Sequence, residues 1–157
     1  MSSLVQYPHL DLIELLLGEH AAILALFRSL EQRLPVMSLK EMQGAGYTVE
    51  ALLMAHAIEE DALLFHSLPE KRESVRKTLD AMFGEHNEQR RMMEELRIAK
   101  TTLAVRKVLR QVIDLTREHF AVEERVLFDL ARKVLGKRKL EELGGEFARR
   151  RGLSTVS

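Results

Sequence analysis

Apolar residues recur at steps of three and four along four long segments of the chain, with polar residues between them. This spacing puts the apolar side chains on one face of an α-helix. The predicted helices span about 10–33, 39–66, 71–98 and 102–134. Pro35, Pro69 and Gly136 follow the first, second and fourth of them, and strand-like alternation is missing. The pattern predicts an all-α protein, an antiparallel up-down-up-down four-helix bundle with short loops.

One histidine interrupts each apolar stripe near the middle of its helix. These residues are His20, His56, His86 and His119. The stripes, which include Leu52 in the second helix and Val126 in the fourth, predict the surfaces that face the core. A single histidine on such a face is commonly a hydrogen-bonded core residue, but one in every helix indicates a shared role.

Two stretches of the chain repeat. Residues 56–65 read "HAIEEDALLF" and residues 119–128 read "HFAVEERVLF". In the helices that precede them, "LGEH" at 17–20 returns as "FGEH" at 83–86. The repeats predict an internal duplication of a helical hairpin, with a pseudo-twofold axis that brings equivalent positions together at the bundle centre.

Each repeat contains a histidine and a glutamate four residues apart, His56 with Glu60 and His119 with Glu123. Residues at this spacing lie roughly 6 Å apart along a helix axis and point in nearly the same direction. The candidate metal ligands are His20, His56, Glu60, His86, His119 and Glu123. A pair of divalent cations bridged by both carboxylates would offset the cost of burying them. An ion-pair network with Arg90 is the alternative, and it leaves four histidines unexplained.

The ligand set favours iron, with manganese second and zinc possible, because calcium and magnesium prefer oxygen ligands alone. Other acidic and imidazole side chains are expected to lie apart from this site. His66 sits where Pro69 ends the second helix, and His9 precedes the first helix. Glu59 and Glu124 neighbour the two glutamates but turn about 100° away, which makes them surface residues or indirect supports of the ligands.

Length predicts one domain over residues 1–157, because a chain of this size can bury a core without disulfides. The core bundle is expected at about 10–134, followed by a short C-terminal extension at about 135–157. A short tail helix is predicted around 137–143, which Gly144–Gly145 would end.

Charge and composition exclude several classes of function. The chain has 24 Lys and Arg against 24 Asp and Glu, so nothing in its net charge recruits nucleic acid or an anionic membrane. Cysteine is absent, which excludes disulfides and thiolate chemistry. The sequence shows neither a signal peptide nor a membrane span, and we expect a cytoplasmic monomer or weak homodimer. The basic cluster at 148–151 is explained as a solvated helix end.

The chain resembles the hemerythrin HHE cation-binding domain over nearly its whole length, in the order His20, His56-x-x-x-Glu60, His86, His119-x-x-x-Glu123. The resemblance implies a non-haem di-iron centre inside a four-helix bundle. It implies that His20 and His56 bind one iron and that His86 and His119 bind the other. Both glutamates, with an oxo or hydroxo group derived from water, would bridge the two ions.

Arg90 departs from the oxygen-carrying hemerythrins, which have a further histidine at that position. The resulting set, two histidines per iron, resembles the repair-of-iron-centres branch of the family, which is linked to nitric oxide and peroxide stress. Those proteins usually carry an extra N-terminal domain with a cysteine motif, which this chain lacks. Arg90 either pairs outward with Glu88 or Glu94, or guards an open coordination position.

Two classes of function follow from the resemblance. The first is a di-iron protein that binds or reacts with oxygen, nitric oxide or hydrogen peroxide in stress response, sensing or iron handling. The second is an enzyme with peroxidase, catalase-like or nitric-oxide-consuming activity. Arg90 makes a reversible oxygen carrier a weaker reading, and a metal-free structural bundle is weaker still. The sequence identifies no redox partner.

Overall fold

The computed structural model describes residues 10–153, and all regular secondary structure in that range is helical. The five long helices are α1 (Leu12–Arg33), α2 (Leu39–Glu59), α3 (Glu73–Ile98), α4 (Thr102–Val122) and α5 (Phe128–Arg150). Short helical turns join them: η1 (Leu34–Val36), η2 (Glu60–Leu64), η3 (Phe65–Ser67) and η4 (Glu123–Leu127). The all-α prediction is confirmed, and the observed helices begin and end close to the predicted bounds.

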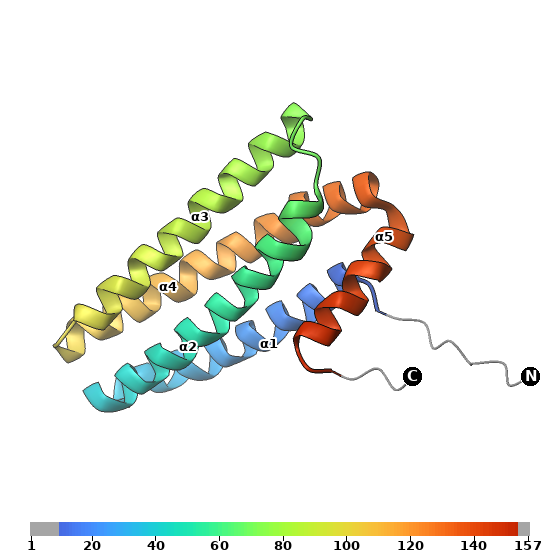
Figure 1. Cartoon of the computed structure of the whole chain (residues 1–157). Coiled ribbons are helices and arrows are strands. Elements are labelled where there is room, and N and C mark those ends of the chain that lie inside the picture. Colours follow the sequence, from blue (N-terminus) through green and yellow to red (C-terminus); the bar gives the residue numbers. More distant parts are fainter. Residues whose placement is uncertain (1–9, 154–157) are drawn as a thin grey trace, which may run out of the picture.

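Helices α1 to α4 lie side by side as one bundle, and the chain passes back and forth along it (Figure 1). Side-chain caps start three of these helices. Asp11 and Ser38 each accept a hydrogen bond from the backbone three residues on, and Thr101 does the same. Such caps satisfy backbone N–H groups that the first turn of a helix leaves without partners. Short connections and capped starts therefore hold neighbouring helices in register.

The core consists of two apolar layers with a polar layer between them. The layer near α5 includes Leu12, Leu16, Phe65, Leu127 and Phe128. The layer at the other end includes Phe27, Leu53, Met93, Val112 and Phe120. The four histidines and two glutamates predicted to bind metal lie between these layers and are buried. Apolar packing on both sides therefore fixes the helices that carry the polar groups.

Both repeats contain a π-helical turn that the sequence did not predict, η2 after α2 and η4 after α4. Each turn begins at one of the two inward glutamates, Glu60 or Glu123. A π turn changes the direction in which later side chains point, because its hydrogen bonds span five residues instead of four. This explains why Val126, predicted to face the core, is 41 % exposed. Leu52 is exposed to the same extent, while its neighbour Leu53 is buried.

Helix α5 continues α4 through η4, bends sharply at Gly136 and then folds back beside α1 (Figure 1). Gly136 has φ 76°, a backbone conformation that glycine adopts without strain. The predicted tail helix is longer than expected, because it passes through Gly144–Gly145 and ends at Arg150. A side chain at Gly144 would meet the backbone of Leu10 and Asp11 well inside contact distance. Gly144 therefore lets α5 approach the start of α1 closely.

Replacing Gly144 with alanine should separate α5 from α1 and destabilise the protein. Overpacking against rigid backbone typically costs about 1–3 kcal/mol. Gly145→Ala is the matched control, because nothing lies within 4 Å of a Cβ built there and alanine favours a helix. Urea unfolding of the two variants measures the difference. Equal free energies of unfolding would show that the close approach at Gly144 has no energetic consequence.

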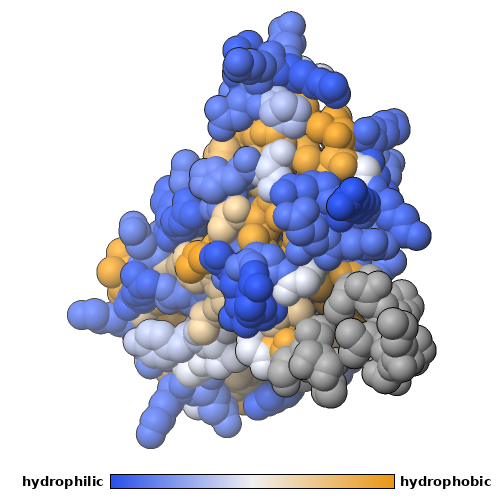
Figure 2. Space-filling model, turned by 45° about the vertical axis from the view of Figure 1, so that its right-hand side comes forward, coloured by the Kyte–Doolittle hydropathy of each residue, from blue (hydrophilic) through white to orange (hydrophobic). Residues whose placement is uncertain are grey.

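Hydrophilic side chains cover most of the face shown in Figure 2, and apolar side chains show through between them. None of the helices in residues 10–153 is both long enough and apolar enough to cross a membrane.

Candidate metal centre

The six residues predicted to bind metal gather at the centre of the bundle. One group consists of His20, His56, Glu60 and Glu123, and the other of Glu60, His86, His119 and Glu123. In each group the possible ligand atoms all lie within 4.8 Å of one another, and every residue is buried. Both glutamates belong to both groups, so the two groups share an edge. Each group offers two imidazoles and two carboxylates, a donor set that suits a metal cation.

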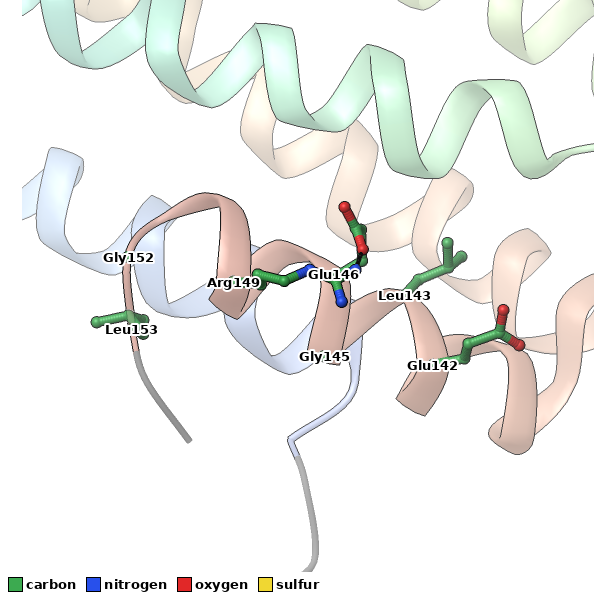
Figure 3. A pocket seen from close by; sticks show the side chains of 7 residues that line it. All are labelled: Glu142, Leu143, Gly145, Glu146, Arg149, Gly152 and Leu153. Atoms are coloured by element: carbon green, nitrogen blue, oxygen red, sulfur yellow. Dashed lines mark ion pairs between the residues drawn. The ribbon is translucent and has the colours of Figure 1, made fainter. Parts of the chain in front are cut away.

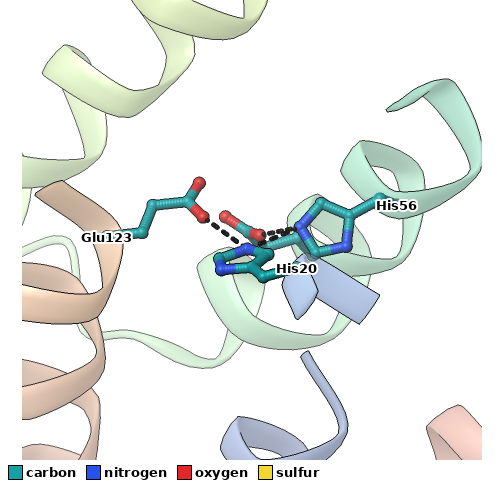
Figure 4. Close-up of side chains that lie close together, drawn as sticks. His20, His56 and Glu123 are labelled. Atoms are coloured by element: carbon teal, nitrogen blue, oxygen red, sulfur yellow. Dashed lines mark hydrogen bonds and ion pairs between the residues drawn. The ribbon is translucent and has the colours of Figure 1, made fainter. Parts of the chain in front are cut away.

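The first group brings together helices that are distant in the sequence. His20 Nε2 lies 3.1 Å from His56 Nε2, and 3.1 Å from Glu123 Oε2. His56 Nε2 lies 2.9 Å from Glu60 Oε2. Figure 4 shows His20 and His56 with their ring edges turned toward each other and Glu123 reaching across from the other side. The nitrogen and oxygen lone pairs of this group therefore converge on one point.

The second group repeats the first with the other half of the chain. His86 Nε2 lies 3.0 Å from His119 Nε2, which lies 2.5 Å from Glu123 Oε1. The two oxygens of Glu123 thus face different groups, Oε2 toward His20 and Oε1 toward His119. A carboxylate oriented in this way can bridge two cations.

The carboxylate oxygens at the centre have no hydrogen-bond partner. This holds for both oxygens of Glu60 and both of Glu123, although imidazole nitrogens lie within about 3 Å of Glu60 Oε2 and Glu123 Oε2. Two anions buried in this way are unstable unless a positive charge offsets them. The same residues fit a pair of divalent cations, since the oxygens and the Nε2 atoms then act as ligands.

A carboxylate holds the outer nitrogen of every one of the four imidazoles. The distances from Nδ1 to the carboxylate are 2.9 Å for His20 with Glu124, 2.9 Å for His56 with Glu19, and 3.1 Å for His86 with Asp61. His119 Nδ1 pairs with Glu85 in the same way. A carboxylate can only accept, so Nδ1 carries the proton and Nε2 is left with a lone pair for a metal.

These four acids follow the internal duplication. Glu19 and Glu85 each precede a histidine in the repeated "GEH" and each hold the histidine of the next helix. Asp61 and Glu124 follow the two inward glutamates and hold His86 and His20, respectively. Sequence reasoning suggested a supporting role only for Glu124. The repeated glycine–glutamate–histidine could have indicated the supporting role of Glu19 and Glu85. The contact between Asp61 and His86 depends on the π turn that starts at Glu60.

Aromatic rings pack against the imidazoles, and here the two halves differ. The His20 ring stacks on Phe120 with centroids 3.7 Å apart, and on Phe128 with centroids 5.5 Å apart. The His86 ring stacks on Phe65 with centroids 5.6 Å apart. Phe65 and Phe128 are equivalent in the repeat, whereas the equivalent of Phe120 is an alanine, Ala57. The duplication is therefore close but not complete around the site.

Charge and burial shift the pKa values of the central groups in opposite directions. Burial lowers the pKa of His20 to about 3, and the charge of His56 adds to this effect. Burial also opposes the charged form of His56, but its contacts with Glu19 and Glu60 outweigh burial and raise its pKa to about 10. Burial and the neighbouring charge of Glu60 raise the pKa of Glu123 well above its usual range. The protein without metal therefore retains protons that a cation would displace.

Arg90 lies at the edge of the second group rather than inside it. Its side chain is 47 % exposed, donates to Asn87 Oδ1 over 2.8 Å and lies 3.8 Å from Asp61 Oδ2. Neither Glu88 nor Glu94 is its partner within the described part of the chain, so the predicted outward pairing is wrong in its details. Arg90 is instead connected to His86 through Asp61.

Three further residues were predicted to lie apart from the metal site. Two of them do lie away from it, and the third lies outside the described residues. His66 is exposed on η3 and belongs to neither group of possible ligands. Glu59 is buried and accepts a hydrogen bond from Arg150 Nε over 2.6 Å. His9 lies outside the described residues.

A family model described as "Hemerythrin HHE cation binding domain" matches residues 11–131 of this chain, and matches again over residues 77–147. The first match covers α1 to α4 and all six residues of the two groups. Comparison with curated proteins and with solved structures gave no significant match.

Proposed function

We propose that this chain, which belongs to the hemerythrin HHE cation-binding domain family, is a non-haem di-iron protein that binds or reacts with oxygen, nitric oxide or hydrogen peroxide. Membership of the family and the two groups of buried histidines and glutamates support metal binding. The choice of iron rests on the ligand chemistry, with manganese or zinc as the alternatives. A role in stress response, sensing or iron handling fits such a centre.

In this proposal each iron has two imidazole ligands, and the two irons share both carboxylates. His20 and His56 hold one ion, and His86 and His119 hold the other. The orientation of Glu123 supports a bridging role for this residue, because its two oxygens face different groups. The outer carboxylates keep every Nδ1 protonated, so Nε2 is the ring nitrogen that binds a cation. At His56, whose pKa is raised to about 10, the cation must first displace a proton from Nε2.

The observation that carries the proposal is the set of four buried carboxylate oxygens without hydrogen-bond partners. Metal analysis with an ultraviolet–visible spectrum of protein made in iron-replete medium tests it. We expect close to two irons per chain and near-ultraviolet absorption that disappears with the metal. A protein that purifies without iron, and takes up none when reconstituted, would contradict the proposal.

A di-iron centre supplies redox chemistry toward small oxygen and nitrogen ligands. The groups contain two imidazoles each, and the third imidazole of the oxygen carriers is replaced by Arg90. Fewer protein ligands leave more room for an external ligand at each ion. This favours a di-iron peroxidase, catalase-like or nitric-oxide-consuming enzyme as the second candidate function, and disfavours a reversible oxygen carrier.

Arg90→His should move the protein toward reversible oxygen binding, because it offers a third imidazole one helical turn after His86. Oxygen uptake by the reduced wild-type protein should be largely irreversible, and the protein should consume hydrogen peroxide. In the variant we expect a larger reversible fraction of oxygen uptake and severalfold slower peroxide consumption. Oxygen release under vacuum and a peroxide electrode measure the two quantities.

The matched control is Arg91→His, because Arg91 pairs with Glu88 and Glu95 on the exposed side of α3. This control should behave like the wild type in both measurements. If the wild-type protein releases its oxygen unchanged over many cycles, and Arg90→His makes no difference, the protein is a carrier and the second candidate fails.

A further inference from the structure

Two arginines at the end of α5 reach back to the bundle, where the sequence predicts a solvated helix end. Arg151 donates to Glu19 twice, from Nε to Oε2 over 2.8 Å and from Nη2 to Oε1 over 3.0 Å. Arg150 donates to Glu59 Oε2 over 2.6 Å. Because Glu19 lies on α1 and Glu59 on α2, the end of α5 is attached to both helices. Figure 1 shows this end of α5 lying across the bundle beside α1.

Arg151 is connected to His56, a proposed metal ligand, through a single side chain, that of Glu19. Glu19 Oε1, which accepts from Arg151, also accepts from His56 Nδ1 over 2.9 Å. The same guanidinium donates to the backbone carbonyl of Ala55 over 3.0 Å, immediately before His56 in the chain. Its Cζ lies 5.1 Å from the centre of the Phe147 ring, which supports it from α5. Arg151 thus contacts the carboxylate that holds His56 and the backbone carbonyl of the residue before His56.

The other three imidazoles have no equivalent contact within residues 10–153. Asp61, which holds His86, lies 3.8 Å from Arg90, a longer contact than that between Arg151 and Glu19, and the Arg90 side chain is 47 % exposed. Glu85 and Glu124 hold their imidazoles without an arginine at ion-pair distance in the described structure. The internal duplication cannot supply a second Arg151, because α5 follows only the second hairpin. The two halves of the centre are therefore chemically unequal on their outer side.

We propose that Arg151 is a positioning residue that fixes His56 through Glu19 and makes the two metal positions inequivalent. This inference rests on the proposed di-iron centre. A carboxylate that accepts from Nδ1 orients the ring and raises the basicity of the nitrogen that binds metal. The two-point contact with Arg151 fixes the plane of the Glu19 carboxylate. His56 is thus more rigidly held than His119.

Proton NMR of the reduced, iron-loaded, full-length protein tests this assignment. Ferrous ions shift the ring N–H resonances of their imidazole ligands out of the usual range. The wild type should show four such exchangeable resonances, one for each Nδ1 that pairs with a carboxylate. Arg151→Gln should move one of the four and speed its exchange with water. The iron affinity of that position should fall roughly threefold to tenfold, less than for a group that contacts a ligand directly.

Arg149→Gln is the matched control. Arg149 pairs with Glu146 beside a surface hollow, as Figure 3 shows, and this pair does not reach the metal ligands. The control should leave all four resonances in place. Arg151→Lys keeps the charge and should recover part of the lost affinity, which loss of helix packing alone would not predict.

The result that overturns the inference is four resonances that Arg151→Gln leaves unmoved, or moves all together. The proposed function fails differently. If the iron-treated wild type shows no shifted exchangeable resonances at all, the di-iron centre itself is wrong, and the inference about Arg151 is overturned with it.

Discussion

The double variant Glu60→Ala, Glu123→Ala should bind almost no iron, whereas the wild type should hold close to two ions per chain. Both glutamates belong to both groups of possible ligands, so each removes a ligand from each ion. What remains at each position is two imidazoles without a negative charge, a weak site for a divalent cation. Iron content after reconstitution and desalting measures the loss.

The double variant should remain folded, which separates loss of ligands from loss of structure. Both glutamate side chains are completely buried, and in the metal-free protein they have no hydrogen-bond partners. Removing Glu60 also removes a carboxylate that stabilises protonated His56, so the metal-free variant should melt at or below the temperature of the metal-free wild type. The two apolar layers of the core remain, so the variant should still unfold cooperatively.

The control for this experiment is His66→Ala, because His66 is exposed and lies outside both groups. It should bind iron like the wild type. A double variant that retains both ions would contradict the assignment of the bridging ligands, and a control that loses iron would show that the assay reports damage to the fold.

The positions of the six central residues could be predicted because they depend on α-helical spacing alone. His56 and Glu60 point the same way since they are four residues apart, and the repeat then indicates His119 and Glu123. The single histidines of α1 and α3 fill gaps in otherwise apolar faces, which makes His20 and His86 visible without any structure. Local periodicity was sufficient for these residues.

Asp61 and Arg151 could not be predicted, because their positions depend on departures from α-helical spacing and on contacts across the bundle. The π turn at Glu60 directs Asp61 to His86, whereas α-helical geometry would turn adjacent side chains about 100° apart. Arg151 reaches Glu19 only because α5 bends at Gly136 and returns along α1. Neither the bend angle nor the contact has a signature in the sequence.

Iron should raise the melting temperature of the wild type by a large amount. A ligand that binds only the folded state stabilises it by about 2.7 kcal/mol per site at a free concentration 100 times its Kd. With two sites, and roughly 2–4 °C for each kcal/mol in a chain of this size, we expect an increase of about 10–20 °C. Anaerobic thermal melts with and without ferrous iron measure it. Identical melts would show that metal is not part of the native core.

The difference in melting temperature between the iron-loaded and the metal-free protein should grow as the pH rises from about 6.5 to about 8.5. The pKa of His56 is about 10 in the folded, metal-free protein, against 6.5 for the ordinary side chain. Its contribution to stability is therefore complete below pH 6.5 and is lost as pH rises toward 10. Contacts with Asp61 and Glu123 outweigh burial and raise the pKa of His86, which acts in the same direction. Each pH unit in this window lowers the stability of the metal-free protein by up to about 1.4 kcal/mol for each such group.

The iron-loaded protein should not lose stability in this pH range, because its imidazoles bind metal in the neutral form and have no extra proton to give up. Metal binding at pH 7 should accordingly release protons, chiefly from His56 and Glu123, whose pKa values are raised in the metal-free protein. Melts of both forms at pH 6.5 and 8.5, with a dye that reports proton release on iron addition, test the two consequences together. Two results would show that the raised pKa values of these groups do not govern metal uptake. One is a difference in melting temperature between the two forms that is smaller at pH 8.5 than at pH 6.5, and the other is iron binding without proton release.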